Sequence, residues 1–190
     1  MYCDNAGFGA VAPGEGVAEK PKALERGGDF PHIILYHRKM EIKAIQENKE
    51  QYMGLLLLAD EQESMIKKYL YSGELFVLFD NDIKTVCVVT QEADRVFEIK
   101  NIATYEKYQR QGYGSLMLKH IIQNYQNKAD TLLIGTGDNE RILSYYKNFG
   151  FVYSHIEKDF FIKNYDHEMY EDGKQLKDMV YLKIDFKDTK

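Results

Sequence analysis

Gln109-Arg110-Gln111-Gly112-Tyr113-Gly114-Ser115 is the stretch that decides how the chain is interpreted, because it joins a predicted strand to a predicted helix. Glycines in such a turn let the backbone approach a ligand closely. The start of the helix adds N–H groups and a positive dipole end, so the turn can hold an anion, most naturally a phosphate. A strand-to-helix turn that merely needs glycine is the alternative. The stretch is neither a P-loop, since no Gly-Lys-Ser/Thr follows, nor a dinucleotide fingerprint, since Met117 stands where the third glycine belongs.

The sequence around this turn predicts a mixed α/β sheet domain. We expect strands at residues 41–45, 74–79, 83–89, 96–104, 131–134, near 151–162 and near 178–186, and helices at 46–58, 60–71, 112–127 and 139–148. Gly135 is expected to end the strand before it. Gly150 is expected to take a left-handed conformation at the end of a helix.

Residues 1–38 form a separate region in composition. All three prolines lie there, with six of the fourteen glycines, and neither a helical nor a strand period is sustained. The region also lacks the apolar core of a signal peptide. We expect an N-terminal extension without a recognisable fold, with an appended leader or a reading-frame artefact as alternatives, and a functional domain over residues 40–190.

Composition and charge exclude several classes of protein. With 25 Lys and Arg against 30 Asp and Glu, the net charge is −5, which disfavours general nucleic-acid binding. The longest aliphatic run, residues 55–58, is far short of the roughly 20 apolar residues of a membrane helix. Only Cys3 and Cys87 are present, which fits a reducing cytoplasm. No two histidines have metal-ligand spacing, so we expect no metal. From the net charge and the short apolar run, we expect no nucleic acid and no membrane.

A second motif follows the glycine turn. Asn139, Tyr146, Gly150 and Phe151 lie on a helix and the start of the next strand. Together with Gln109, Gly112 and Gly114, in this order and on these elements, they resemble the GNAT superfamily of acyl-CoA-dependent N-acetyltransferases. The resemblance covers about residues 40–190.

The resemblance implies both a fold and a cofactor site. The implied fold is α/β (α+β), with a mixed, mostly antiparallel sheet whose fourth and fifth strands splay apart between flanking helices. The cofactor, acetyl-CoA, would place its pyrophosphate on the turn formed by Gln109, Arg110, Gln111, Gly112, Tyr113, Gly114 and Ser115. Its pantetheine arm would run along the backbone of Ile102 and Thr104 and contact Asn139. The N–H of Ile102 would donate to the thioester oxygen.

Two residues are the candidates for catalysis. Tyr146 matches the family's general acid, although a core tyrosine is the alternative; Tyr145 beside it is expected only to pack. Glu98 matches the catalytic glutamate of the protein-acetylating branch, 14 residues before Gly112. Strand alternation is expected to place Glu98, Lys100, Ile102 and Thr104 on one face. A glutamate merely paired with Lys100, and a water chain instead of a single base, are the alternatives.

These residues predict a transfer of acetyl from acetyl-CoA to a primary amine by direct attack in a ternary complex. The acceptor is a small polyamine-like or aminoglycoside-like molecule, or a protein amine. Two acidic groups would attract it, with solvated charged loops as the alternative: Asp60, Glu61 and Glu63, and Asp166, Glu168, Glu171 and Asp172. The alternatives are a non-catalytic module that senses acyl-CoA and an α/β phosphoryl-binding protein unrelated to CoA. The oligomeric state is open, with a homodimer as one option.

Overall fold

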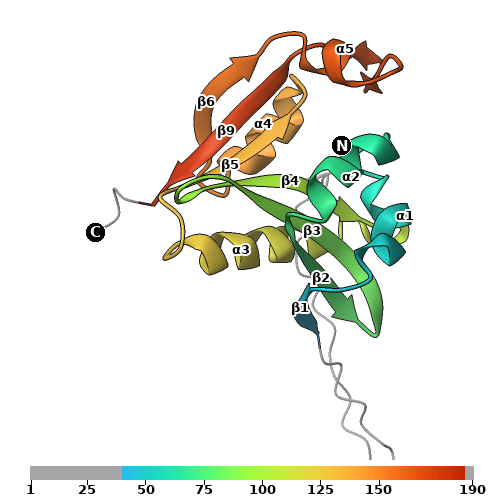
Figure 1. Ribbon diagram of the computed structural model, residues 1–190, viewed down its shortest axis with the longest axis vertical. Coiled ribbons are helices and arrows are strands. Elements are labelled where there is room, and N and C mark those ends of the chain that lie inside the picture. The colour runs from blue at the N-terminus through green and yellow to red at the C-terminus, as the bar shows by residue number, and fades with distance from the viewer. Residues whose placement is uncertain (1–39, 187–190) are drawn as a thin grey trace, which may run out of the picture.

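A seven-stranded sheet organises the protein, whose computed structural model describes residues 40–186 (Figure 1). The sheet order is β1-β2-β3-β4-β5-β9-β6, and all neighbours are antiparallel except the parallel pair β4 and β5. The predicted mixed, mostly antiparallel sheet is therefore confirmed. Its strands are β1 (Glu41–Ile45), β2 (Glu74–Asp80), β3 (Asp82–Ala93), β4 (Val96–Thr104), β5 (Thr131–Thr136), β6 (Val152–Glu157) and β9 (Met179–Asp185).

Helices cover both faces of the sheet. On one face, side chains of α1 (Met53–Leu56) and α2 (Glu63–Leu70) form an apolar cluster with β2 and β3. On the other face, α3 (Tyr113–Tyr125) and α4 (Glu140–Lys147) bury Met117, Leu118 and Tyr146 against the strands. Short 3₁₀ helices η1 (Lys49–Tyr52) and η2 (Glu106–Tyr108) precede α1 and α3. The helix predicted over residues 46–58 is shorter than expected, because Asn48 adopts a positive φ of 52° before η1.

The segment between β6 and β9, residues 158–178, differs most from the prediction. The strand expected near 151–162 ends at Glu157, and α5 (Phe160–Asn164) follows, then a hairpin of β7 (Tyr170–Glu171) and β8 (Lys174–Gln175). Asp159 breaks the strand because it takes a positive φ of 59°, and its N–H donates to the Asp178 carboxylate over 2.9 Å. We call residues 158–178 the cover segment.

Gly135 does not end β5, which continues to Thr136. A Cβ atom at position 135 would lie 2.9 Å from the sulfur of Met179 and 3.1 Å from the ring of Tyr181, so these side chains of β9 would have to shift. Glycine within a strand often marks such a close approach, which the sequence alone does not distinguish from a strand end. The left-handed conformation predicted for Gly150 is confirmed, with a φ of 93°.

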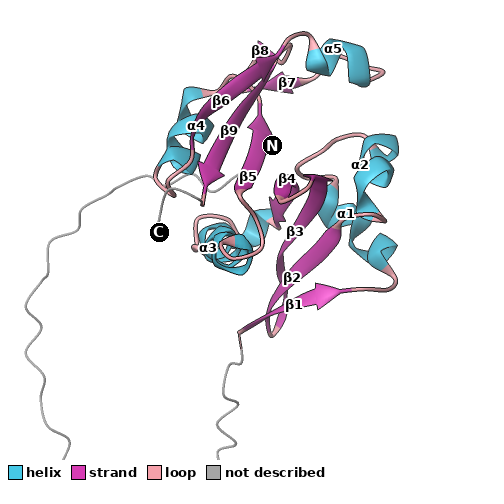
Figure 2. Cartoon of the chain, turned by 60° about the vertical axis from the view of Figure 1, so that its left-hand side comes forward, coloured by secondary structure: helices cyan, strands magenta, loops and turns pink. Residues whose placement is uncertain are grey.

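The parallel strands β4 and β5 pair only at their first residues. Their register begins with Val96 opposite Thr131 and ends with Ile99 opposite Ile134, although β4 continues to Thr104. β5 pairs with β9 along its whole length but beyond Ile134 no longer pairs with β4, and the two parts of the sheet diverge (Figure 2). The predicted splay of the fourth and fifth strands is confirmed.

A β-bulge in β4 overturns the predicted alternation. Val88 pairs with Asn101 and Val89 with Ile99, so Lys100 is an extra residue with no partner in this register. The prediction that Glu98, Lys100, Ile102 and Thr104 share a face is therefore wrong. Glu98 and Lys100 border a cavity on the α2 side, whereas Ile102 belongs to the core beneath α3.

The prediction that residues 1–38 are an extension without a recognisable fold lies outside the described residues. Shortening the chain tests it. A chain that begins at Met40 is expected to fold and keep its turnover, because β1 and all its pairs with β2 lie within residues 41–79. Melting curves and thiol-release rates of the full and shortened chains check this. An insoluble or inactive shortened chain would show that the preceding residues complete the core or the site.

Candidate active site

A cavity of about 430 Å³ lies between α2, the last residues of β3, the first half of β4 and the cover segment. Half of the residues that line it are apolar or aromatic: Ala59, Met65, Tyr69, Ile99, Phe160, Phe161, Tyr165, Met169, Leu176, Met179 and Tyr181. Its charged residues are Asp60, Lys68, Glu92, Glu98 and Lys100. A largely apolar pocket with a few placed polar groups is typical of a site for a small molecule.

Glu98 contributes a buried carboxylate to this wall. The residue is 7% exposed, and its Oε2 accepts a hydrogen bond from Nζ of Lys100 over 2.6 Å. Nζ of Lys100 also lies 3.3 Å from the carboxylate of Glu92. Burial raises the pKa of Glu98, and the nearby Lys100 ammonium offsets part of that rise. Pairing with Lys100 is thus present, but the glutamate is not solvated, and a raised pKa brings a carboxylate closer to the range of an effective base.

The glycine turn leads into α3 at a residue in the left-handed conformation. Gly112 is the N-cap of α3 with a φ of 86°, and a Cβ atom built there would meet no atom within 4 Å. The first hydrogen bond within the helix runs from the N–H of Leu116 to the carbonyl of Gly112, and the positive end of the helix dipole lies at this turn. This geometry suits an anion.

Side chains of the same turn tie it to the end of β4. Gln109 Nε2 donates to the carbonyl of Thr104 over 3.2 Å, and Gln111 Nε2 donates to the carbonyl of Lys107 over 2.9 Å. Arg110 takes a positive φ of 60° between them. The turn is therefore fixed on the strand whose edge separates from β5. The predicted contacts of these residues with a pyrophosphate stay predictions.

We expect Gly112→Val to raise the KM for acetyl-CoA at least about tenfold, or about 1.4 kcal/mol. A β-branched residue is strained at a φ of 86° and would place its side chain in the open space above α3. Gly114→Val is expected to raise the same KM for a different reason, because Gly114 is buried in the first turn of α3 and a larger side chain there would displace the turn. Gly150→Val is the matched control, since Gly150 also has a positive φ and open space but lies at the far end of α4. Steady-state kinetics and melting curves check this; an unchanged KM in folded Gly112→Val would contradict the phosphate site.

Tyr146 lies in the core rather than in the wall of the cavity. It is fully buried, with its ring 6.0 Å from that of Phe151 and 5.4 Å from that of Tyr145, measured between centroids. Its packing role is thus visible, and its catalytic role stays a prediction. Tyr145 does more than pack, because its hydroxyl lies 3.2 Å from Oγ of Ser115 and links α4 to the turn.

Asn139 is the N-cap of α4. Its Oδ1 accepts the N–H of Arg141 over 3.1 Å, and its Nδ2 donates to Asp172 over 2.9 Å. Asn139 therefore caps α4. A contact with the pantetheine arm stays a prediction.

Of the two predicted acidic groups, only Asp60 lines the cavity. Glu61 lies 3.7 Å from His167, Glu63 pairs with Lys67, and Asp172 pairs with Arg141. The aromatic wall was not predicted, because its members come from α2, the cover segment and β9 and share no spacing in sequence.

The described residues contain neither a metal cluster nor a membrane helix. Within residues 40–186, no three His, Cys, Asp or Glu residues are grouped so that they could hold a metal ion. No helix in the same range is long and apolar enough to cross a membrane.

Comparison with known proteins identifies the class and the family to which this chain belongs. A family model described as an acetyltransferase (GNAT) domain matches residues 71–153, from just before β2 to the start of β6. The chain is 34% identical over 151 residues to YvbK, an uncharacterized N-acetyltransferase of Bacillus subtilis (strain 168), which covers 78% of this chain and 97% of that protein. The chain therefore belongs to the GNAT family of N-acetyltransferases.

Solved structures agree with this assignment. A GNAT family acetyltransferase from Elizabethkingia anophelis, with acetyl-CoA bound, is 36% identical and superposes with a TM-score of 0.73 over 77% of this chain and 97% of its own. A Bacillus subtilis acetyltransferase in complex with CoA is 34% identical, with a TM-score of 0.71 over 77% and 99%.

Proposed function

We propose that this N-acetyltransferase transfers acetyl from acetyl-CoA to a primary amine by direct attack in a ternary complex. The observation that carries the proposal is the position of Glu98. This buried carboxylate lines the cavity and directly precedes Ile99, the last residue of β4 that pairs with β5. The cavity described above and the place where β4 and β5 separate therefore meet at Glu98.

Two features of this chain fit acetyl-CoA. The edge of β4 beyond Ile99 is not paired with β5, so it can take an extended pantetheine arm as an added strand. The turn at Gly112 leads into the N-terminus of α3, the positive end of the helix dipole, and a Cβ atom at Gly112 would meet no atom within 4 Å, so a pyrophosphate can approach the backbone there. Two similar structures contain acetyl-CoA or CoA, which supports the same ligand here.

The residues of the chain have separate tasks in the transfer. Acetyl-CoA supplies an activated acetyl group, whose carbonyl carbon bonds to the amine nitrogen while the carbon–sulfur bond breaks. Glu98 takes the proton that the amine nitrogen loses, directly or through a water. The N–H of Ile102 donates to the carbonyl oxygen, which gains negative charge. Tyr146 donates its phenolic proton to the departing sulfur.

The test is thiol release from acetyl-CoA with a panel of primary amines. The purified protein is expected to release CoA thiol with at least one amine, at a rate above that without amine, and mass spectrometry should find the acetylated product. Calorimetry with CoA runs in parallel. Tight CoA binding without thiol release for any amine would instead support the non-catalytic sensor.

A further inference from the structure

Asp60 is a buried carboxylate that the proposed transfer does not use. It lies in the loop between α1 and α2, is 8% exposed, and borders the cavity. Its Oδ1 accepts the N–H of Gln62 over 3.3 Å and the hydroxyl of Tyr165 over 3.1 Å, and its Oδ2 accepts the hydroxyl of Tyr69 over 3.1 Å. A carboxylate offers about four acceptor positions, so one position on Oδ2 is left.

Hydrogen bonds hold Asp60 in a fixed place. The Tyr69 hydroxyl that donates to Asp60 accepts a hydrogen bond from Nδ2 of Asn101 over 3.1 Å, and the same nitrogen lies 3.0 Å from the carbonyl of Leu56. This chain of contacts links β4, α2, the loop and the cover segment. A carboxylate held in this way is preorganised for a ligand.

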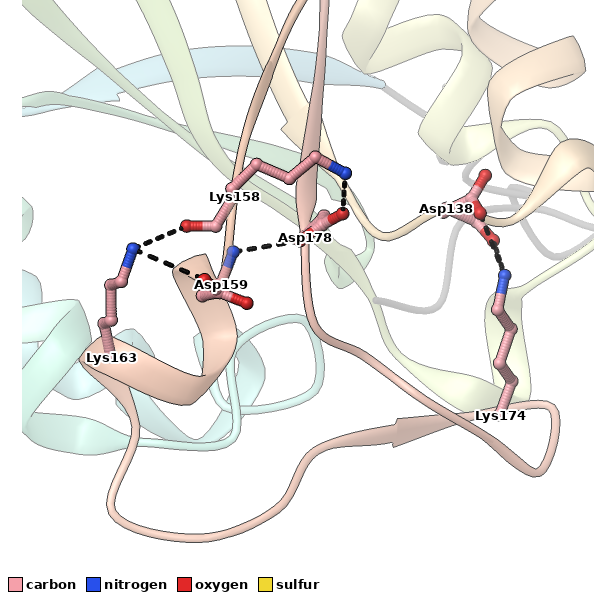
Figure 3. Close-up of polar contacts among 6 residues, drawn as sticks. All are labelled: Asp138, Lys158, Asp159, Lys163, Lys174 and Asp178. Atoms are coloured by element: carbon pink, nitrogen blue, oxygen red, sulfur yellow. Dashed lines mark hydrogen bonds and ion pairs between the residues drawn. The ribbon is translucent and has the colours of Figure 1, made fainter.

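The cover segment is itself anchored on both sides of the cavity. Beside Asp60, the N–H of Asp166 donates to Oε1 of Gln62 over 3.1 Å. At its base, Nζ of Lys158 lies 2.6 Å from Asp178, which also accepts the N–H of Asp159 (Figure 3). The hydroxyl of Tyr165 is therefore presented to Asp60 by a segment with fixed ends.

Within residues 40–186, the ion pairs of the cavity wall leave Asp60 out. Nζ of Lys100 pairs with both Glu92 and Glu98. Lys68, the other lysine of the wall, contacts the sulfur of Met65 over 3.0 Å. Among residues 40–186, no Lys, Arg or His side chain forms an ion pair with Asp60. Burial raises the pKa of Asp60, and the hydrogen bonds from Gln62, Tyr69 and Tyr165 offset part of that rise. A nearby cation would stabilise the ionised form of a carboxylate buried in this way.

We infer that Asp60 binds a second cationic group of the acceptor while the reacting amine faces Glu98. The inference rests on the proposed function and narrows its substrate class. The acceptor is a small diamine-like compound, since an apolar and aromatic wall surrounds the two carboxylates and favours an apolar segment between two nitrogen groups. A cavity of about 430 Å³ suits a small molecule. Asp60 is then a specificity residue, separate from the catalytic base.

The test compares a diamine with a monoamine of equal length on the full chain. The probes are 1,5-diaminopentane and 1-aminopentane, with acetyl-CoA saturating. Wild type is expected to prefer the diamine in kcat/KM by at least about tenfold. Asp60→Asn is expected to lose that preference through a higher KM for the diamine, with kcat/KM for the monoamine nearly unchanged. Glu63→Gln is the control, because Glu63 is an exposed acid of the same region that pairs with Lys67.

Each other outcome has a definite meaning. Equal losses for both amines in Asp60→Asn would assign Asp60 a structural role and overturn the inference. Equal use of both amines by wild type would overturn it while the acetyltransferase stands. If neither these two amines nor any amine of the panel supported thiol release, the proposed function itself would be contradicted. Calorimetry of both amines in the presence of CoA, on wild type, tests the subsite without turnover and without a variant that has to fold; equal affinities there would also overturn it.

Discussion

Glu98→Gln is expected to lower kcat/KM for the amine at pH 7 by roughly 10²-fold, the contribution of a positioned general base. An alkylamine with a pKa of about 10.4 is almost wholly protonated at this pH, so attack requires that a group accept its proton. Glutamine keeps the size of the side chain and removes its basicity. Burial raises the pKa of Glu98, which means that ionisation of this carboxylate is disfavoured in the folded protein. Because the substitution removes that buried charge, it is not expected to unfold the protein.

The pH profile separates a base from a packing residue. In wild type, the acid limb of kcat/KM reports the protonation of Glu98, and activity falls as the pH drops through its raised pKa. In Glu98→Gln this limb is expected to disappear, and the rate should rise about tenfold per pH unit towards the pKa of the amine itself. Initial rates between pH 5 and pH 10 measure both.

Glu92→Gln is the matched control, since Glu92 lines the same cavity and also faces Lys100 over 3.3 Å. It carries the same change of charge in a more exposed position. A fall in Glu92→Gln as large as that in Glu98→Gln would indicate a diffuse electrostatic effect. A fall of less than about tenfold in Glu98→Gln would favour a water chain over a single base.

The main elements of the fold could be predicted because each has a local signal. The glycine turn, the apolar stripe of α3 and the motif of α4 mark their own positions, and Gly112 and Gly150 have the positive φ values that their places require. The splay of β4 and β5 followed from the resemblance to the GNAT family. It was not visible in the residues themselves.

Features that depend on contacts between distant residues could not be predicted. The bulge at Lys100 is a register shift between β3 and β4, and an uninterrupted run of strand residues gives no sign of it. The apolar residues of α5 are equally suited to a strand, and the contact of Asp159 with Asp178 decides against one. Tyr165 reaches Asp60 across 105 positions, which no local pattern encodes.

Tyr146→Phe is expected to lower kcat by roughly 10²-fold and to leave the KM for acetyl-CoA nearly unchanged. A departing thiolate benefits from a proton donor, and the substitution removes only the hydroxyl. The ring packs against Phe151 in the core, and phenylalanine preserves that contact, so the melting temperature should change little. Stopped-flow or steady-state thiol release measures kcat, and saturation with acetyl-CoA measures KM.

The choice of control decides how that result is interpreted. Tyr145→Phe is a poor control, because the Tyr145 hydroxyl contacts Ser115 in the turn. Tyr125→Phe is better matched: Tyr125 is equally buried in the same core, and its hydroxyl donates to Glu74 over 3.0 Å, outside the site. If Tyr146→Phe loses turnover while Tyr125→Phe keeps it, the loss belongs to the missing proton donor and not to a missing buried hydroxyl. Full activity in Tyr146→Phe would reduce Tyr146 to the packing role that its burial already shows.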